Sequence, residues 1–91
     1  MYDLISTASF ERSLRRFSRA HPELRQRVAR VLTDLEADPY QPHLRLHALQ
    51  GGLNGLHAVS VTYRYRMTLT LRVDERTITL LDIGSHADVY R

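Results

Sequence analysis

The sequence predicts an α+β domain in which an N-terminal strand and an antiparallel helix hairpin pack on a small antiparallel β-sheet of about four strands. Two observations predict this class. Apolar residues recur at the helical period in the first half of the chain, whereas they alternate with polar residues in the second half. No repeat, low-complexity tract or linker interrupts the 91 residues, so a single domain covering 1–91 is expected.

The first half begins with an expected short strand at 2–5, followed by a helix. Phe10, Leu14 and Phe17 stand at i, i+4 and i+7, which is the spacing of one helical face. Four arginines form a basic ridge that the same spacing centres on the opposite face: Arg12, Arg15, Arg16 and Arg19. One face of this helix is therefore expected to pack, and the other is a candidate surface for RNA phosphates.

A second helix is expected between the breaks at 20–22 and 38–39. Pro22 suits the first position of a helix, because its missing N–H would have no helical partner there. Asp38-Pro39 should end the helix. The apolar residues that continue at helical spacing are Leu24, Val28, Val31, Leu32 and Leu35. The two helices are expected to form an antiparallel hairpin joined by a tight turn.

The second half reads as strands. Odd-numbered positions from Val59 to Val73 are apolar or aromatic and the positions between them are polar, a period of two. Because this run is too long for one ordinary strand, we expect a turn near Thr62 to Arg64. A second turn is expected at Asp74-Glu75, and it leads to "TITLLDI", whose nearly continuous apolar character suggests a central strand.

Composition narrows the classes of protein. The chain has no cysteine, which excludes a disulfide framework and thiolate metal sites. No early apolar run is long enough for a signal peptide or a membrane span, so a cytoplasmic location is expected. All 13 basic residues are arginine. Arginine suits phosphate groups or an acidic protein, but a genome rich in arginine codons would produce the same bias, so the bias leaves both readings open.

Several stretches in order along the chain resemble a known family. The helix hairpin after a first strand is followed by "LHALQGGLNGLH", then by the strand "YRYRM" and the ending "IGSHADVY". Together they resemble the RelE/ParE superfamily of bacterial type II toxins, and most closely its YafQ-like branch of mRNA interferases. The resemblance implies a metal-independent endoribonuclease that cuts mRNA at the ribosome. It also implies a cognate antitoxin as partner, in a toxin–antitoxin hetero-oligomer.

The resemblance also implies functional residues. The histidine before the Leu-Gln-Gly stretch matches His47, and the histidine after the terminal Ile-Gly matches His86. Arg66 matches the arginine of the Tyr-Arg strand, and Tyr90 matches the aromatic residue near the C-terminus. YafQ-like sequences carry a further aspartate and histidine where this chain reads Ala58 and Ser60. His57 stands close by as a possible substitute.

Cleavage of RNA without a metal requires activation of a 2′-hydroxyl, protonation of the departing 5′-oxygen and neutralisation of phosphate charge. Histidine can serve as acid or base near neutral pH, so His47 and His86 are the candidates, with the assignment between them open. Arg66 would supply the fixed charge, and Tyr90 would stack on a base or donate a hydrogen bond. Asp88 would orient an imidazole or cap the tail.

Alternatives remain at this stage. Arg64 and Arg72 share the parity of Arg66, so the three arginines could simply form a solvated sheet face. The fold also allows a ParE-like toxin that binds gyrase without nuclease activity, or a catalytically weakened homologue. No cofactor or metal is expected, because the one histidine pair at i, i+4 spacing, His43 and His47, follows a proline in an irregular stretch.

Overall fold

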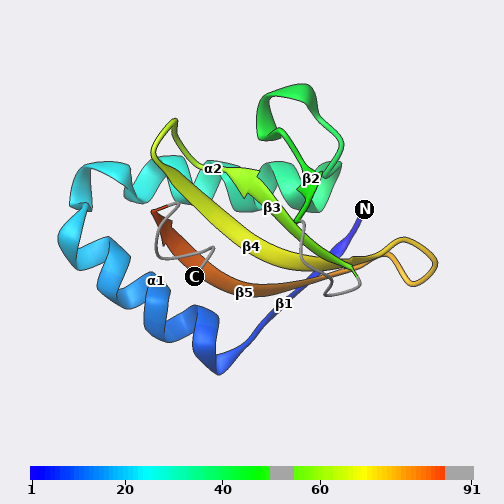
Figure 1. Cartoon of the computed structure of the whole chain (residues 1–91), viewed down its shortest axis with the longest axis horizontal. Helices are drawn as coiled ribbons and strands as arrows, with labels where there is room; N and C mark the ends of the chain where they lie inside the picture. Colours follow the sequence, from blue (N-terminus) through cyan, green and yellow to red (C-terminus); the bar gives the residue numbers. More distant parts are fainter. Residues whose placement is uncertain (50–54, 86–91) are drawn as a thin grey trace.

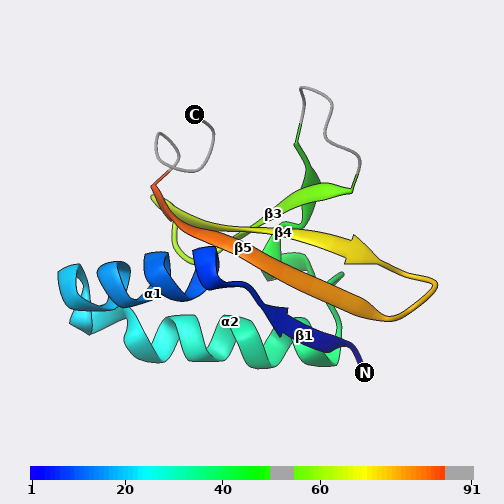
Figure 2. The same cartoon turned by 90° about the horizontal axis from the view of Figure 1, so that it is seen from below.

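The computed structural model describes residues 1–49 and 55–85, and its arrangement is shown in Figure 1. Along the chain the elements are β1 (Asp3–Ser6), α1 (Ala8–Ala20), the 3₁₀ helix η1 (Pro22–Leu24), α2 (Arg25–Ala37), the 3₁₀ helix η2 (Pro42–Leu44), β2 (His47–Ala48), β3 (Leu56–Ser60), β4 (Tyr65–Arg72) and β5 (Thr77–Ser85). Within these residues the strands form one sheet in the order β1-β5-β4-β3-β2. Both long helices lie on one side of it (Figure 2). The expected α+β class is confirmed.

The helix α1 is fixed at its start by one threonine. The hydroxyl of Thr7 accepts a hydrogen bond of 3.1 Å from the N–H of Phe10 and donates one of 2.8 Å to the carbonyl of Leu80. The first contact caps the helix, which is typically worth about 1 kcal/mol, and the second ties the helix to β5. Phe10 and Phe17 are buried as expected. All four arginines of the basic ridge are exposed: Arg12, Arg15, Arg16 and Arg19.

The second helix starts one turn later than Pro22. Pro22 begins the 3₁₀ helix η1, and α2 continues from Arg25 to Ala37. Its buried residues are Val28, Val31 and Leu35, all of them predicted positions of the apolar face. The helix is followed by its C-cap residue Asp38, whose carboxylate accepts a hydrogen bond of 2.9 Å from the N–H of Tyr40. The predicted helix hairpin is confirmed.

The sheet differs from the expected one in two respects. β1 pairs with β5 in parallel, from Asp3 opposite Thr77 to Ser6 opposite Leu80, so the sheet is mixed. A two-residue strand, β2, adds to the edge beside β3. Alternation of apolar residues fixes the two faces of a strand, but it says nothing about its direction relative to a distant strand. Both expected turns are present, and "TITLLDI" lies in β5 between β1 and β4 as predicted.

A β-bulge in β5 changes which residues of this strand face the core. Thr68 pairs with Asp82 and Leu69 with Leu80, so Leu81 is an extra residue on β5. As a result Leu80 and Ile83 are both buried although they are three positions apart. The largest fully buried side chains, which fill the space between helices and sheet, include Phe10, Leu35, Leu44, Met67, Leu69 and Ile78. Burial of each such side chain contributes roughly 1.5–3 kcal/mol.

None of the helices in 1–49 and 55–85 is long and apolar enough to span a bilayer.

Candidate functional site

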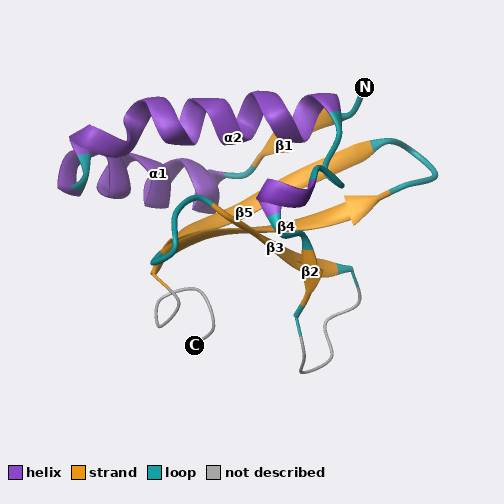
Figure 3. Ribbon diagram, turned by 90° about the horizontal axis from the view of Figure 1, so that it is seen from above, coloured by secondary structure: helices purple, strands orange, loops and turns teal. Residues whose placement is uncertain are grey.

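A groove of about 950 Å³ opens between the helix α2, the short helix η2 and the turn that joins β3 to β4. Figure 3 shows η2 lying between the end of α2 and β2, so that η2 and the short connection to β2 lie beside the sheet. One wall of the groove is formed by α2, the opposite wall by the β3–β4 turn, and the floor by the sheet and the segment after η2. The lining residues are Glu23, Gln26, Arg27, Arg30, Val31, Asp34, His43, Arg45, His47, Ser60, Val61, Thr62, Tyr63 and Arg66. Two residues predicted as catalytic, His47 and Arg66, are among them.

His47 is held in a defined orientation by its own loop. Arg45, directly after η2, has a left-handed backbone with φ 53°, and its carbonyl oxygen lies 2.8 Å from Nδ1 of His47. Because a carbonyl can only accept, Nδ1 carries the hydrogen in this contact. The neutral imidazole therefore has its lone pair on Nε2, the form that can accept a proton.

Arg66 lies half-buried on the same face of the sheet as His47. In the strand register His47 is opposite Ala58, while Arg66 is opposite Ser60 two positions along β3. Residues two apart on a strand point to the same face, so His47 and Arg66 share a face as well as the groove. On its other side Arg66 is opposite Gly84, which has no side chain. The small neighbours leave room for a guanidinium group.

The structure places the two positions at which YafQ-like sequences carry a further aspartate and histidine. Ala58 is directly opposite His47, and Ser60 is directly opposite Arg66. Ala58 is fully buried, and beyond it in the same row lies Thr68, also buried, whose hydroxyl has no hydrogen-bond partner among the residues that the structure describes. Neither Ala58 nor Ser60 provides an ionisable group to His47 or Arg66.

His57 lies elsewhere. It is opposite Ala48 and Leu69, so it occupies the other face of the β2–β3 ribbon from His47. Its Nδ1 is 2.8 Å from the carbonyl oxygen of Gly55, and His57 does not line the groove. The register therefore gives no support to His57 as a substitute beside His47.

The two arginines that share the sequence parity of Arg66, Arg64 and Arg72, lie outside the groove. Arg64 is exposed in the β3–β4 turn, where its backbone N–H donates to the Thr62 hydroxyl at 3.2 Å. Arg72, at the far end of β4, forms ion pairs with Asp74 at 3.4 Å and Glu75 at 3.6 Å. The hydrogen bond from Arg72 lowers the pKa of the Asp74 carboxyl. Of these three arginines, only Arg66 lines the groove.

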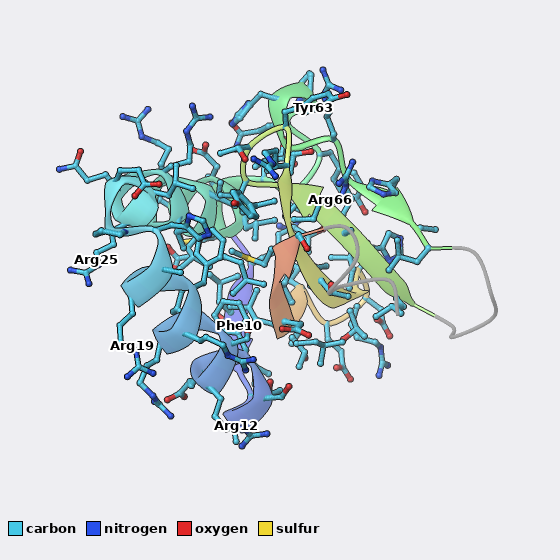
Figure 4. The ribbon with its side chains drawn as sticks, turned by 60° about the vertical axis from the view of Figure 1, so that its left-hand side comes forward. Phe10, Arg12, Arg19, Arg25, Tyr63 and Arg66 are labelled. Atoms are coloured by element: carbon cyan, nitrogen blue, oxygen red, sulfur yellow. The ribbon has the colours of Figure 1, made fainter. Side chains whose placement is uncertain are left out.

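Three candidates, His86, Asp88 and Tyr90, lie outside the described residues. Among the groove residues that had not been predicted as functional are three arginines and one tyrosine: Arg27, Arg30, Arg45 and Tyr63. A signal for two of them was present, because Arg27 and Arg30 stand at i, i+3 on the polar face of the second predicted helix. The helical wall of the groove is α2, whereas the basic ridge lies on α1. Figure 4 shows Arg12 and Arg19 well away from Arg66 and Tyr63.

Two comparisons of the sequence, with protein-family models and with curated proteins, match nothing. Comparison of the fold does match solved structures. YafQ from Escherichia coli strain BL21(DE3) superposes with a TM-score of 0.81 over 100% of both chains, at 14% sequence identity. The same protein in the DinJ-YafQ toxin-antitoxin complex also gives 0.81, with 15% identity over 99% of this chain and 98% of that chain. The chain has the fold of the RelE/ParE toxins.

Two further solved proteins share the RelE/ParE toxin fold with this chain. A metal-bound toxin from Helicobacter pylori gives a TM-score of 0.81 at 21% identity, over 98% of this chain and 99% of that chain. The YoeB/ParE toxin from Agrobacterium tumefaciens gives 0.76 at 13% identity, over 92% and 98%. The resemblance inferred from the sequence is thus confirmed at the level of the fold. In this chain, the described residues contain no group of three or more histidine, aspartate or glutamate side chains arranged to hold a metal ion.

Proposed function

We propose that this protein is the toxin of a type II toxin–antitoxin pair and cuts ribosome-bound mRNA as a metal-independent endoribonuclease. One observation carries the proposal: His47 and Arg66 lie on one face of the sheet and line one groove. A histidine oriented by a carbonyl and a fixed cation in one groove suit phosphodiester cleavage. The fold supports the toxin assignment, because solved proteins that share it are toxins.

The proposed reaction uses the 2′-hydroxyl of the RNA as nucleophile. His47 accepts the proton of this hydroxyl at Nε2, and the 2′-oxygen forms a bond to the adjacent phosphorus. The bond from phosphorus to the 5′-oxygen breaks, and a second acid–base group protonates that oxygen. The products are a 2′,3′-cyclic phosphate and a 5′-hydroxyl. His86 is the proposed second group, and Tyr90 is proposed to position the substrate.

Arg66 provides the charge that the reaction needs at the phosphate. Its guanidinium is ionised at any working pH and presents a planar fork that matches two phosphate oxygens. In a half-buried site its charge is screened less than on an open surface. We therefore assign Arg66 the stabilisation of charge on the phosphorane, with no proton transfer.

A catalytically weakened toxin is the second candidate. Ala58 and Ser60 stand opposite His47 and Arg66, where ionisable partners would have to be placed on β3. Fewer positioned acid–base groups mean slower chemistry, since each typically contributes about 10²–10⁴-fold. This candidate keeps the same site and predicts the same products at a lower rate.

The proposed protein partner is a cognate antitoxin. YafQ, which shares the fold, has been solved in a toxin-antitoxin complex with DinJ. For this chain we propose a hetero-oligomer in which the antitoxin blocks the groove with an acidic or amphipathic element, because arginines line both the helical wall and the floor.

The test is cleavage of mRNA in a translation extract by the purified protein, with mapping of the new 3′ ends. We expect fragments with cyclic phosphate ends, and a loss of about 10²–10⁴-fold in rate for His47→Ala. Arg72→Gln is the control for Arg66→Gln, because both remove one charge from β4 and Arg72 lies outside the groove. Inhibition of gyrase supercoiling without any mRNA cleavage would instead support a ParE-like toxin.

A further inference from the structure

The groove contains more positive charge than the cleavage chemistry requires. Besides Arg66 it is lined by Arg27 and Arg30 from α2 and by Arg45 after η2. In the part of the chain that the structure describes, no hydrogen bond or ion pair engages the guanidinium groups of Arg27, Arg30 and Arg45. Unpaired arginines around one groove attract an anion with several charged groups.

The acidic residues of the groove do not neutralise these arginines. Asp34 pairs with His43, with Oδ2 and Nε2 2.8 Å apart, and Glu23 pairs with His21 at 3.5 Å. Both carboxylates are therefore directed to histidines. With the histidines neutral, the four arginines outnumber the two carboxylates of the lining.

Tyr63 forms the tip of the opposite wall and has no evident role in the fold. The residue is 95% exposed, which is unusual for an aromatic residue. The turn is stabilised by its neighbours instead: the N–H groups of Val61 and Thr62 donate to the carbonyl of Tyr65 at 2.9 and 3.2 Å. The Thr62 hydroxyl in turn accepts from the N–H of Tyr65 at 3.3 Å. Figure 4 shows Tyr63 on the same side of the molecule as Arg66.

An exposed aromatic ring beside unpaired arginines is the combination that binds single-stranded nucleic acid. The arginines grip phosphates and the ring stacks on an unpaired base. An acidic peptide would use the arginines but would have no need of a stacking ring. The volume of about 950 Å³ is near the upper end of ligand pockets, which span roughly 300–1,000 Å³.

We propose that this groove holds single-stranded RNA beside the cleavage site, with Arg27, Arg30 and Arg45 on phosphates and Tyr63 stacked on a base. The inference rests on the proposed nuclease function, because the strand reaches the groove next to His47 and Arg66. These four groove residues then position the strand and contribute to which sequence is cut, while His47 and Arg66 act at the scissile phosphate.

The test uses RNA binding without cleavage. A fluorescent single-stranded oligoribonucleotide with 2′-O-methyl groups throughout cannot be cut by 2′-hydroxyl attack, so its anisotropy reports binding alone. We expect Arg27→Gln/Arg30→Gln to weaken binding and to flatten its dependence on salt by about 1.4 in log–log slope, at ~0.7 per lost phosphate contact. Tyr63→Ala should weaken binding roughly 5- to 150-fold with the slope unchanged, and Tyr63→Phe should retain most of it.

The matched control is Arg25→Gln/Arg72→Gln. Both residues are exposed and lie outside the groove, so the double variant has the same net charge as Arg27→Gln/Arg30→Gln. An equal loss of binding in both double variants would overturn the proposal, because only net charge would then matter. Binding of poly-glutamate, with no binding of the oligonucleotide, would also overturn it and would identify the groove as a protein-binding surface.

Failure of the nuclease proposal can be distinguished from failure of this one. Groove-dependent RNA binding by a protein that cuts no mRNA would retain the RNA groove and reject the activity. Normal mRNA cleavage by the Arg27→Gln/Arg30→Gln and Tyr63→Ala variants, together with unchanged RNA binding, would retain the activity and reject the groove.

Discussion

The hydroxyl of Ser13 on α1 accepts a hydrogen bond of 3.1 Å from the backbone N–H of Ile83 on β5. The same hydroxyl donates to the carbonyl of Phe10 at 3.2 Å, and Ser13 is only 7% exposed. Ile83 follows the β-bulge of β5, where the regular ladder is interrupted. Ser13 is thus a second link, besides Thr7, between α1 and β5.

Ser13→Ala is expected to destabilise the fold by about 0.5–1.5 kcal/mol, because the hydrogen bond between α1 and β5 is lost while the N–H of Ile83 keeps its second acceptor, Oδ1 of Asp82 at 2.9 Å. For a domain of this size, that corresponds to a fall in melting temperature of roughly 4–8 °C for each kcal/mol. Thermal unfolding followed by circular dichroism measures it. Ser9→Ala, on the exposed start of the same helix, is the control and should stay within about 0.5 kcal/mol of the parent. If both variants unfold together, the bond to Ile83 contributes nothing.

When both proposed acid–base groups are removed, the loss in cleavage rate should be smaller than the product of the two single losses. His47→Ala and His86→Ala are each expected to lower mRNA cleavage by about 10²–10⁴-fold while the protein remains folded. The double variant should cost less than the two factors multiplied, because groups that act as one unit are not additive. Single-turnover cleavage rates measure this, and full activity in a folded His86→Ala protein would remove that residue from the site.

Tyr90→Ala separates a substrate-binding role from a structural one. If Tyr90 stacks on a base or donates a hydrogen bond to the RNA, cleavage should fall with the melting temperature unchanged. If the ring only packs the end of the chain, the melting temperature should fall and activity should decrease in step with unfolding. Cleavage and thermal stability measured on the same protein distinguish the two.

The basic ridge of α1 offers an independent surface for ribosomal RNA. All four of its arginines are exposed, and they can be replaced together by glutamine: Arg12, Arg15, Arg16 and Arg19. Ribosome binding should then weaken and its salt dependence should flatten by nearly one unit for each lost contact. Stability should hardly change, because exposed charges contribute little. An unchanged salt slope in a ribosome-pelleting assay would exclude the ridge as an RNA-binding surface.

The ion pair between Arg72 and Asp74 predicts a local pH effect. The pKa of Asp74 is lowered from its ordinary value of 3.8, first by the hydrogen bond from Arg72. A carboxyl with a lowered pKa in the folded state adds stability above its ordinary pKa, and this is lost as the pH falls through the lowered value. Arg72→Gln should raise the pKa of Asp74 toward 3.8 in an NMR titration. Arg64→Gln, at the other end of β4, should leave it unchanged.

Local sequence pattern was sufficient for the helices, the main strands and their turns. The spacing of Phe10 and Phe17, the break at Pro22 and the alternation around Met67 and Leu69 all correspond to observed elements. These signals are local because the period of apolar residues reflects the geometry of one helix or one strand. The family resemblance depended on the same local stretches taken in order.

The arrangement of the site needed the tertiary structure. His47 and Arg66 stand far apart in the sequence and meet in one groove because β2 and β4 both pair with β3 in a particular register. Register also separates His57 from His47, although both histidines stand near the same glycine-rich stretch of the sequence. A shift of one residue in pairing would exchange the faces of the strand, and no local pattern specifies pairing between such distant residues.

Composition and period therefore determined the α+β class, the helix hairpin and the histidines and arginines available for chemistry. Assembly of distant segments decided the parallel direction of β1, the β-bulge beside Ile83 and the groove that unites Arg27 and Tyr63 with the sheet. The physical reason is the different sequence range over which these interactions act. Backbone geometry acts within a few residues, whereas strand pairing and side-chain packing depend on contacts between residues separated by most of the chain.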